Sequence, residues 1–434
     1  MNLKQKPTCV FYGAVDTFSG YGARARGIAK ALIELKGEEW DIKILSCRWG
    51  STPSGFIDEH PEWEFLKKYI QPNLQLSSQP DYMFWNTIPS EGQIVGKWNC
   101  LITAGIESTI APADWIEGCQ RMDLVLGSSK HTIDVLRNSK FEKRDQNTNQ
   151  VAGIIEWNKP GDVLFEGIEE DIYKPQPSST FDLSSIPEDF CYLFNSMWTD
   201  GDFGEDRKNV GLLIKAFFET FKNKSKKPAL ILKTTTVGAS YMDRDKILKR
   251  IKAIQDTVKS TNLPNIYLLH GEVSDKDINE LNNHPKVKAM ISLTKGEGWG
   301  RCIAEFSVVN KPIITTNFSG HKDYLNPEFT TLLNGNLTQI HPSAANNMLL
   351  REASWFSVDY GQVGYYLNDV FENYKKYNEL AKRQGYHSRT NFSFNKMKEK
   401  FEGILSSVPS FAQPVNLVLP TMNKSISLPK LKKL

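Results

Sequence analysis

Short apolar segments alternate with longer helix-like segments along most of this chain, and this alternation restricts the possible folds more than any other feature. Alternation of this kind is typical of parallel sheets whose crossover helices cover both faces. In the N-terminal part, strand patterns interleave with helical patterns at residues 9–13, 21–35, 41–47, 98–103, 113–119, 124–127 and 130–138. The sequence therefore predicts a doubly wound α/β domain at the start of the chain.

The same pattern begins again after a stretch rich in proline and serine at residues 174–180. Its strand-like and helix-like segments lie at 192–196, 210–221, 229–233, 245–260, 266–269, 289–293 and 311–316. We therefore predict two Rossmann-like domains, 1–174 and 188–385, that face a central cleft. The length of 434 residues, with 40% hydrophobic and 24% charged residues, agrees with two globular cores.

The composition indicates neither a highly charged binding partner nor a membrane-spanning segment. The net charge is only +3, no run of about 18 apolar residues occurs, and the first residues contain no apolar signal-peptide core. We therefore expect a cytoplasmic protein with no transmembrane segment. The six cysteines show no Cys-X-X-Cys or Cys/His ligand spacing, so we expect reduced core residues instead of disulfides or a zinc site.

The strongest functional signal lies between Lys295 and Tyr324. Glu297 stands in a glycine-rich turn, and Glu305 follows after seven intervening residues, one turn into the next predicted helix. A helix N-terminus offers backbone N–H groups to a diphosphate, and a carboxylate can accept hydrogen bonds from vicinal sugar hydroxyls. The segment therefore suits a nucleotide sugar. An ordinary βαβ unit with surface glutamates is the alternative, because short motifs recur by chance.

In this setting of strand, loop, helix and strand, the chain resembles nucleotide-sugar glycosyltransferases of GT-B fold, in particular glycosyltransferase family 4. The resemblance covers roughly residues 8–405 and is most specific over 289–324. It implies that Glu297 faces the transferred sugar and that Glu305 holds the ribose of the donor. The other donor-binding residues that it implies in this loop are Gly296, Gly298, Trp299 and Gly300. It also implies a helix at 386–407 that crosses back to the first domain, which would bind the acceptor.

A glycine-rich turn near the N-terminus resembles the first glycine-rich loop of the family. Gly20 and Gly22 precede a helix rich in arginine and alanine, and the resemblance implies that they admit donor phosphates or the acceptor close to the backbone. A simple turn before a helix is the alternative. Arg24 and Arg26 are expected to face phosphate or solvent, with solvent expected for at least one.

Arg207 and Lys208, just before the helical pattern at 210–221, resemble the basic pair of the family. There the pair neutralises the donor diphosphate, and a fixed cation is most effective when charge accumulates on the leaving phosphate. This chain departs from the family pattern, because Asn195 to Trp198 replace the usual arginine and an acidic insertion follows at 199–206. Lys208 is therefore the firmer assignment.

Four more residues are candidates at predicted strand ends. His270 and Gly271 resemble the loop against which the nucleobase packs, although a core histidine is an alternative, and Lys233 ends the strand at 229–233. Glu107 follows another strand and is expected to orient an acceptor hydroxyl, with a solvent-exposed acid as the alternative. His321 is a further candidate for contact with the donor.

Three Asp-X-Asp pairs, at 200–202, 243–245 and 275–277, offer a rival metal chemistry. The other large glycosyltransferase fold holds a divalent cation and the diphosphate with such a pair. Each pair here lies in a polar loop or at a predicted helix start, where aspartate is a common cap. The first also lacks the EF-hand register, because Glu205 takes the sixth position. We therefore expect no metal and no cofactor beyond the donor.

The C-terminal region adds helical patterns at 363–384 and 394–405 and an irregular tail at 408–434. Residues 423–434 contain four lysines and no acid. Such a run is either a solvated end or a contact for an anionic surface such as nucleic acid. The tail and residues 103–109 loosely resemble phage-encoded members of the family, some of which glycosylate modified DNA bases.

The sequence thus predicts a retaining, metal-independent glycosyltransferase, transferring a hexose or pentose from a nucleotide-diphosphate sugar to an unidentified acceptor hydroxyl. One alternative is a phage-type enzyme that modifies hydroxylated bases in DNA, in the host cytoplasm. Another is a nucleotide-sugar-binding protein without catalysis, and a third is an epimerase or phosphorylase of the same fold. The sugar, the nucleobase, the acceptor and the oligomeric state do not follow from the residues.

Overall fold

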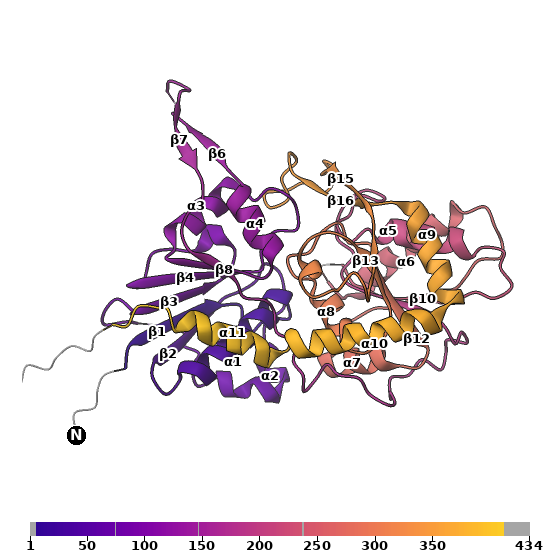
Figure 1. Ribbon diagram of the computed structural model, residues 1–434, viewed down its shortest axis with the longest axis horizontal. Helices are drawn as coiled ribbons and strands as arrows, with labels where there is room; N and C mark the ends of the chain where they lie inside the picture. The colour runs from indigo at the N-terminus through magenta and orange to yellow at the C-terminus, as the bar shows by residue number, and fades with distance from the viewer. Residues whose placement is uncertain (1–5, 74, 146, 237, 412–434) are drawn as a thin grey trace, which may run out of the picture.

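The computed structural model describes residues 6–411, apart from 74, 146 and 237, and these fold into two α/β lobes (Figure 1). The first lobe, indigo to magenta in the picture, contains the N-terminal half of the chain, and the second contains most of the C-terminal half. The predicted basic segment at 423–434 lies outside the described residues. Two doubly wound domains were predicted, and this prediction is confirmed.

The first lobe is built on a six-stranded parallel sheet of order β2-β1-β3-β4-β5-β8. Its central strands are continuous apolar runs because helices cover both faces, and β4 is buried along its whole length. The strands are β1 Thr8–Gly13, β2 Asp41–Ser46, β3 Tyr82–Asn86, β4 Trp98–Thr103, β5 Leu124–Gly127 and β8 Gly161–Val163.

The second lobe repeats the design with a parallel sheet of order β11-β10-β9-β12-β13-β14. Here the strand order reverses at β9, so a crevice opens at the carboxyl ends of β9 and β12, where ligands bind in such sheets. The strands are β9 Cys191–Asn195, β10 Ala229–Lys233, β11 Ile266–Leu269, β12 Val287–Ser292, β13 Ile313–Thr316 and β14 Thr331–Leu333.

Helices cover both sheets. Several begin at a serine that caps the first turn, such as Ser19, whose Oγ accepts from the N–H of Gly22. The α-helices are α1 Gly20–Lys36, α2 Phe56–Glu59, α3 Ala113–Arg121, α4 Lys130–Asn138, α5 Val210–Phe221, α6 Tyr241–Asp256, α7 Asp275–Asn283, α8 Arg301–Ser307, α9 Tyr360–Glu372, α10 Tyr374–Asn391 and α11 Phe394–Leu405. Short 3₁₀ turns occupy Pro61–Leu66, Pro89–Glu91 and Gly320–Asp323.

The single helix predicted at 363–384 is two helices, α9 and α10. They meet at Asn373, whose backbone leaves the helical region at φ −112° and ψ 31° and whose side chain donates to Asp369. Apolar periodicity alone does not reveal this break, because both helices bury one face. The predicted border at 385/386 falls inside α10, and the chain passes between the lobes at Phe392 and Ser393 instead.

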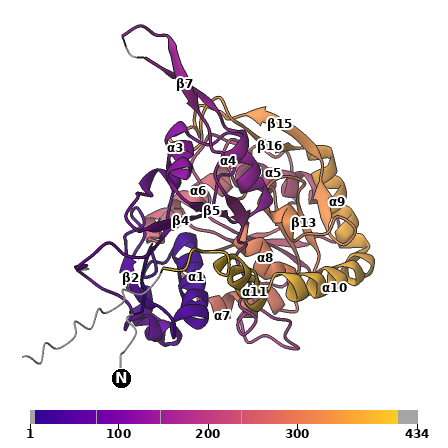
Figure 2. The same cartoon turned by 60° about the vertical axis from the view of Figure 1, so that its left-hand side comes forward.

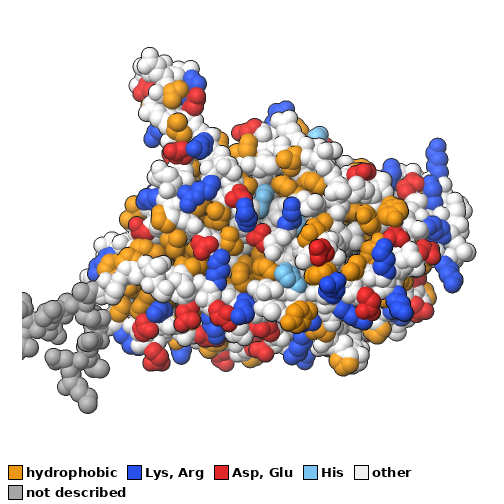
Figure 3. Space-filling model, viewed as in Figure 1, with side chains coloured by type: hydrophobic (Ala, Val, Ile, Leu, Met, Phe, Trp, Pro, Cys, Tyr) orange, Lys and Arg blue, Asp and Glu red, His pale blue; other side chains and the backbone are white. Residues whose placement is uncertain are grey.

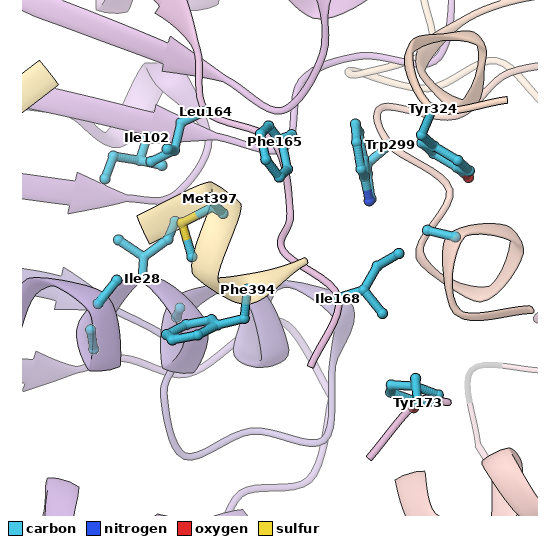
Figure 4. Close-up of a cluster of buried hydrophobic side chains, with 14 of the residues drawn as sticks. Ile28, Ile102, Leu164, Phe165, Ile168, Tyr173, Trp299, Tyr324, Phe394 and Met397 are labelled. Atoms are coloured by element: carbon cyan, nitrogen blue, oxygen red, sulfur yellow. The ribbon is translucent and has the colours of Figure 1, made fainter. Parts of the chain in front are cut away.

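The two lobes share a packed junction. Figures 1 and 2 show α10 on the second lobe and α11 against α1 of the first. Backbone bonds join Ile168 to both sides of this crossing, from its N–H to the carbonyl of Phe392 at 2.9 Å and from the N–H of Phe394 to its carbonyl at 2.8 Å. Around them a buried apolar cluster includes Phe165 of the connecting segment and Trp299 of the second lobe (Figure 4).

Two antiparallel hairpins were not predicted. One, β6 Phe141–Arg144 with β7 Val151–Ile155, stands clear of the first lobe and has charged side chains of both signs (Figure 3). The other, β15 Gly335–Gln339 with β16 Ser354–Val358, belongs to the second lobe, and we call residues 335–358 the flap. The flap contacts the first lobe through two hydrogen bonds of 2.9 Å. The N–H of Thr109 donates to the carbonyl of Ser354, and the N–H of Ser354 donates to Oγ1 of Thr109.

Among residues 6–411, leaving aside the three positions not described, no helix has the length and apolar character required to span a bilayer.

Candidate active site

The glycine-rich loop between β12 and α8 lies directly against the first lobe. A Cβ on Gly296 would stand 1.8 Å from the carbonyl oxygen of Glu107, and one on Gly298 would stand 2.1 Å from that of Ala104. Any side chain at either position would therefore force the lobes apart. Gly300 adopts φ +88° at the N-cap of α8, a conformation that favours glycine.

Four charged side chains from both lobes meet beside this loop. Lys208 Nζ lies 2.5 Å from Oε1 of Glu297, and Arg207 Nη1 lies 3.4 Å from its Oε2. The other terminal nitrogen of Arg207 lies 3.4 Å from Oε1 of Glu107, which belongs to the first lobe. The Arg207 guanidinium therefore bridges the two lobes through two carboxylates, and Glu297 binds two cations.

These contacts set the protonation of the group. Burial by itself would raise the pKa of Glu297, but the positive charges of Lys208 and Arg207 outweigh it and lower that pKa to about 2. Burial lowers the pKa of Lys208, and its neighbour Arg207 adds to this, against the pull of Glu297. Burial also disfavours the charge of Arg207, yet the Glu107 and Glu297 carboxylates raise its pKa. Glu297 is thus a carboxylate at neutral pH.

The acidic insertion at 199–206 fixes this basic pair. Oδ1 of Asp206 accepts from the N–H of Val210 at the start of α5, and Glu205 forms an ion pair of 3.0 Å with Lys295. The N–H of Lys295 in turn donates to the carbonyl of Arg207 at 2.7 Å. The insertion thus ties the start of α5 to the glycine-rich loop, and the basic pair and Glu297 are held together.

Glu305 lies in a separate buried cluster further along α8. Its Oε1 accepts from Nε of Arg301 at 2.5 Å, and Arg301 also lies 3.6 Å from Asp275, to which the hydroxyl of Tyr173 donates at 2.9 Å. Burial raises the pKa of Glu305 to about 7, although Arg301 acts in the opposite direction. Arg301 thus forms an ion pair with Glu305, the carboxylate that we predict to bind the ribose.

The N-terminal glycine pair has two different environments. Gly20 is exposed at the start of α1 with open space around it, whereas a Cβ on Gly22 would stand 2.3 Å from the carbonyl oxygen of Thr17. Gly22 is therefore required for packing, and a ligand can approach the backbone at Gly20. No observation tests the predicted contact of either glycine with the donor.

Among the remaining predicted donor residues, the side chains of Trp299 and His270 already contact other parts of the protein. The indole of Trp299 is buried between Phe165 and Tyr324, so it anchors the loop within the junction (Figure 4). Both ring nitrogens of His270 lie near carbonyl oxygens, of Thr234 at 3.2 Å and of Ser240 at 3.1 Å. The half-buried Lys233 ends β10, and Gly271 has φ +122°. Their donor-binding roles stay predictions.

The structure bears on two expectations about polar side chains, one for Arg24 and Arg26 together and one for His321. The expectation that Arg24 or Arg26 faces solvent is wrong, because both are buried at 3% exposure. Arg24 donates to the carbonyl of Leu164, and Arg26 donates to the carbonyls of Val15 and Thr17 and stacks on Phe56. His321 is fully buried, with Nε2 2.6 Å from the carbonyl of Thr316. Its Nδ1 is buried and has no hydrogen-bond partner among the described residues, and the contact of His321 with the donor stays a prediction.

The Asp-X-Asp pairs do not converge on one point. Asp243 completes a capping box with Ser240, Asp277 accepts a bond from Ser274, and Asp275 belongs to the Arg301 cluster. Asp200 lines a cavity between the lobes that Glu107 and Arg207 also line. Within the described part of the chain, no group of three or more His, Cys, Asp or Glu side chains is arranged to hold a metal ion.

A cavity of about 670 Å³ opens between the lobes next to Glu107 and Arg207, and the sequence did not reveal it. We call it the cleft cavity. Aromatic side chains of the first lobe form one wall, and the flap forms another. Its lining includes Tyr21, Trp49, Trp115, Trp198, Asp200 and Asn346. The only sequence signal was the position of Trp49 and Trp115 after β2 and within α3, where aromatic residues also occur in ordinary cores.

Comparison with known structures identifies the fold, whereas the sequence comparisons find no match. No family model matches the sequence, and no curated protein matches it. Among solved structures, the chain is similar to HepE from Anabaena in complex with UDP and glucose, with TM-score 0.59, 13% identity, and coverage of 93% of this chain and 100% of HepE.

It is also similar to a glycosyltransferase from Rickettsia africae (TM-score 0.58, 15% identity, 92% of this chain and 97% of that one). A third similar structure is sucrose-phosphate synthase from Thermosynechococcus elongatus (TM-score 0.58, 9% identity, 93% and 98%). The likeness covers both lobes, and together with the two parallel sheets it shows that this chain has the two-domain α/β architecture of the GT-B fold.

Proposed function

We propose that the protein is a retaining glycosyltransferase that uses a nucleotide-diphosphate sugar and requires no metal. The observation that carries the proposal is the convergence of Lys208, Arg207 and Glu297 beside the glycine-rich loop, at the crevice of a GT-B fold. Two cations within reach of one crevice can neutralise a diphosphate. HepE, which has a similar fold, is described in complexes with UDP and glucose and with UDP-glucose, so UDP-glucose is the first donor to test.

In this proposal the donor diphosphate replaces Glu297 as the partner of Lys208 and Arg207, and Glu297 turns to the hydroxyls of the sugar. The bond between the anomeric carbon and the phosphate oxygen breaks as the acceptor oxygen bonds to the same face of that carbon. The acceptor proton passes to the departing phosphate oxygen. The two cations stabilise the charge that grows on this phosphate, which lowers the barrier because the charge is largest in the transition state.

Release of UDP separates catalysis from mere binding. Purified protein is incubated with UDP-glucose, and UDP is quantified with and without simple hydroxyl acceptors, while calorimetry measures donor affinity. We expect slow hydrolysis without acceptor and faster release with one. Tight binding of several nucleotide sugars without release of nucleoside diphosphate under any condition would establish the non-catalytic alternative instead.

Glu297→Gln is expected to reduce the turnover number about tenfold or more while the affinity for UDP changes little. In the proposal the carboxylate contacts the transferred sugar, which free UDP lacks, so its loss affects the reacting complex more than nucleotide binding. Initial rates of UDP-glucose turnover and calorimetry with UDP provide the two values. A rise in the Michaelis constant with unchanged turnover would contradict this placement of Glu297.

Activity is expected to survive excess EDTA, with rates unchanged within error. In the proposal the charge of the diphosphate is neutralised by Lys208 and Arg207, so no divalent cation is needed for leaving-group departure. The check is a rate measurement with protein dialysed against EDTA, then supplemented with Mg²⁺ or Mn²⁺. Loss of activity on chelation and its return with either ion would show that the basic pair does not perform this role.

A further inference from the structure

The cleft cavity lies beside the proposed reaction centre but is lined differently from it. Glu107 and Arg207 are part of its lining, and its volume of about 670 Å³ is in the range of small-molecule sites. Residues from both lobes and from the flap line it, so it is formed only when the lobes are together. A bound molecule here would have its end next to the charged group at Glu297.

An aromatic platform forms the wall of the cavity on the first lobe. The rings of Tyr21 and Trp49 stack with centroids 3.8 Å apart and an interplanar angle of 24°. The hydroxyl of Tyr21 accepts from the N–H of Ala104 at 3.2 Å and lies 3.2 Å from Oγ1 of Thr103, so the pair is held in place. Trp115 lines the same cavity and is buried in α3.

The opposite wall adds hydroxyl-binding groups with little positive charge. Trp198 and Asp200 come from the end of β9 and the insertion, and the flap contributes Asn346. Arg207 is the one cation among the described residues that line the cavity, and in the proposed function it faces the donor diphosphate, so it is not free to bind a second anionic group. The carboxylates of Glu107 and Asp200 would repel a phosphate group. This lining therefore disfavours a polyanion.

We propose that the cleft cavity binds the acceptor and that this acceptor is an uncharged sugar ring, such as the terminal hexose of a neutral glycoside. The inference rests on the proposed function and names its substrate class. Sugar rings present apolar C–H faces, which pack on aromatic rings, and equatorial hydroxyls, which carboxylates and amides bind. A ring stacked on Trp49 brings a hydroxyl toward Glu107, whose carboxylate can accept its hydrogen bond.

The proposal also gives the flap a part in acceptor selection. Residues 343–346, Met348 and Leu349 of the flap line the cavity, and the two bonds between Thr109 and Ser354 fix the flap against the first lobe. The flap is joined to the insertion as well, because Ser343 Oγ accepts from the N–H of Asp202 at 3.0 Å. The wall that faces the aromatic platform is thus held on two sides.

The first test is direct binding, which does not require turnover. Methyl glucoside, methyl mannoside and maltose are titrated into the protein in the presence of UDP, with saturation-transfer NMR and tryptophan fluorescence as readouts. Glucose 6-phosphate and an oligonucleotide containing 5-hydroxymethylcytosine are titrated in parallel. We expect at least one neutral sugar to bind and both anionic probes to bind more weakly. Preferential binding of the oligonucleotide or of glucose 6-phosphate would overturn the proposal, as would failure of all neutral sugars to bind.

Variants then locate the site. Trp49→Ala is expected to weaken binding of the neutral sugar about tenfold or more, which corresponds to about 1.4 kcal/mol, with UDP affinity unchanged. Trp85→Ala is the matched control, because Trp85 is half-buried in the same lobe, packs on Tyr12 and does not line the cavity. Asp200→Asn provides a second variant on the opposite wall. Equal sugar affinity in wild type, Trp49→Ala and Asp200→Asn would place the sugar elsewhere.

The two proposals fail in different ways. If UDP-glucose and other nucleotide sugars neither bind nor react, the proposed function fails, whatever the sugar titrations show. If donor is turned over but neutral sugars neither bind nor accelerate release of UDP, only the acceptor assignment is wrong.

Discussion

Lys208→Ala is expected to lower the turnover of UDP-glucose about 10²- to 10³-fold, which is the effect of removing one preorganised charge-stabilising group from an active site. Lys208 Nζ lies 2.5 Å from Glu297 and is buried, so no solvent cation can take its place without rearrangement. Because the donor diphosphate is already negatively charged before the reaction, the affinity of Lys208→Ala for the donor should also fall. Turnover should fall further, because the leaving phosphate carries most charge in the transition state.

The measurement is the initial rate of UDP release at saturating donor, paired with calorimetry of UDP binding. Lys208→Arg keeps the charge and should retain more activity than alanine, although its planar fork has another geometry. Lys215→Ala removes a lysine from the outer side of the same helix α5 and should behave as wild type. Melting temperatures identify any variant that loses activity through unfolding. A folded Lys208→Ala protein with turnover near wild type would remove Lys208 from the proposed mechanism.

Glu305→Ala is expected to weaken UDP binding by about 1.5 to 3 kcal/mol, roughly 10- to 150-fold, because a charged hydrogen-bond acceptor for the ribose hydroxyls is lost. Nε of Arg301 lies 2.5 Å from this carboxylate, so the ribose hydroxyls must share the carboxylate with Arg301 or displace it. Calorimetry with UDP is the direct check. Asp256→Ala, at the exposed end of α6, is the matched control and should bind UDP as wild type does.

The pH dependence of UDP binding gives a second, independent test of the contact between Glu305 and the ribose. Burial raises the pKa of Glu305 to about 7, so below that pH the carboxyl is largely protonated and cannot accept two hydrogen bonds from the ribose. Affinity should therefore increase as the pH rises through about 7. UDP itself titrates in this range, and the difference between wild type and Glu305→Gln removes that contribution. Identical pH profiles in both proteins would show that Glu305 does not contact the nucleotide.

Local sequence signals located most of the elements that build the two lobes. β4 has the predicted bounds at both ends, because a short and mostly apolar segment between polar turns is typical of a buried strand in a parallel sheet. Helix α5 likewise follows from its amphipathic pattern. Hairpins β6–β7 and β15–β16 escaped prediction, since β6, β7 and β15 are largely exposed and β16, although mostly buried, is only five residues long.

The candidate site divides in the same way. The spacing of Glu297 and Glu305 and the basic pair before α5 are local patterns, and they are visible in the sequence. The environment of each side chain is not local. Nothing near Arg24 in the chain indicates that Leu164, 140 residues away, would accept its hydrogen bond, and nothing near Trp299 indicates that Phe165 would cover it.

What the sequence by itself determined is therefore most of the strands and helices that build the two lobes, the two-lobed α/β architecture and the loop that carries Glu297, because apolar periodicity and turn residues act over a few neighbouring positions. The tertiary structure decided which side chains are buried, which charges are paired and where the cleft cavity opens. Those properties arise between residues far apart in the chain. Glu107 meets Arg207, and Thr109 meets Ser354, only because the two lobes pack face to face.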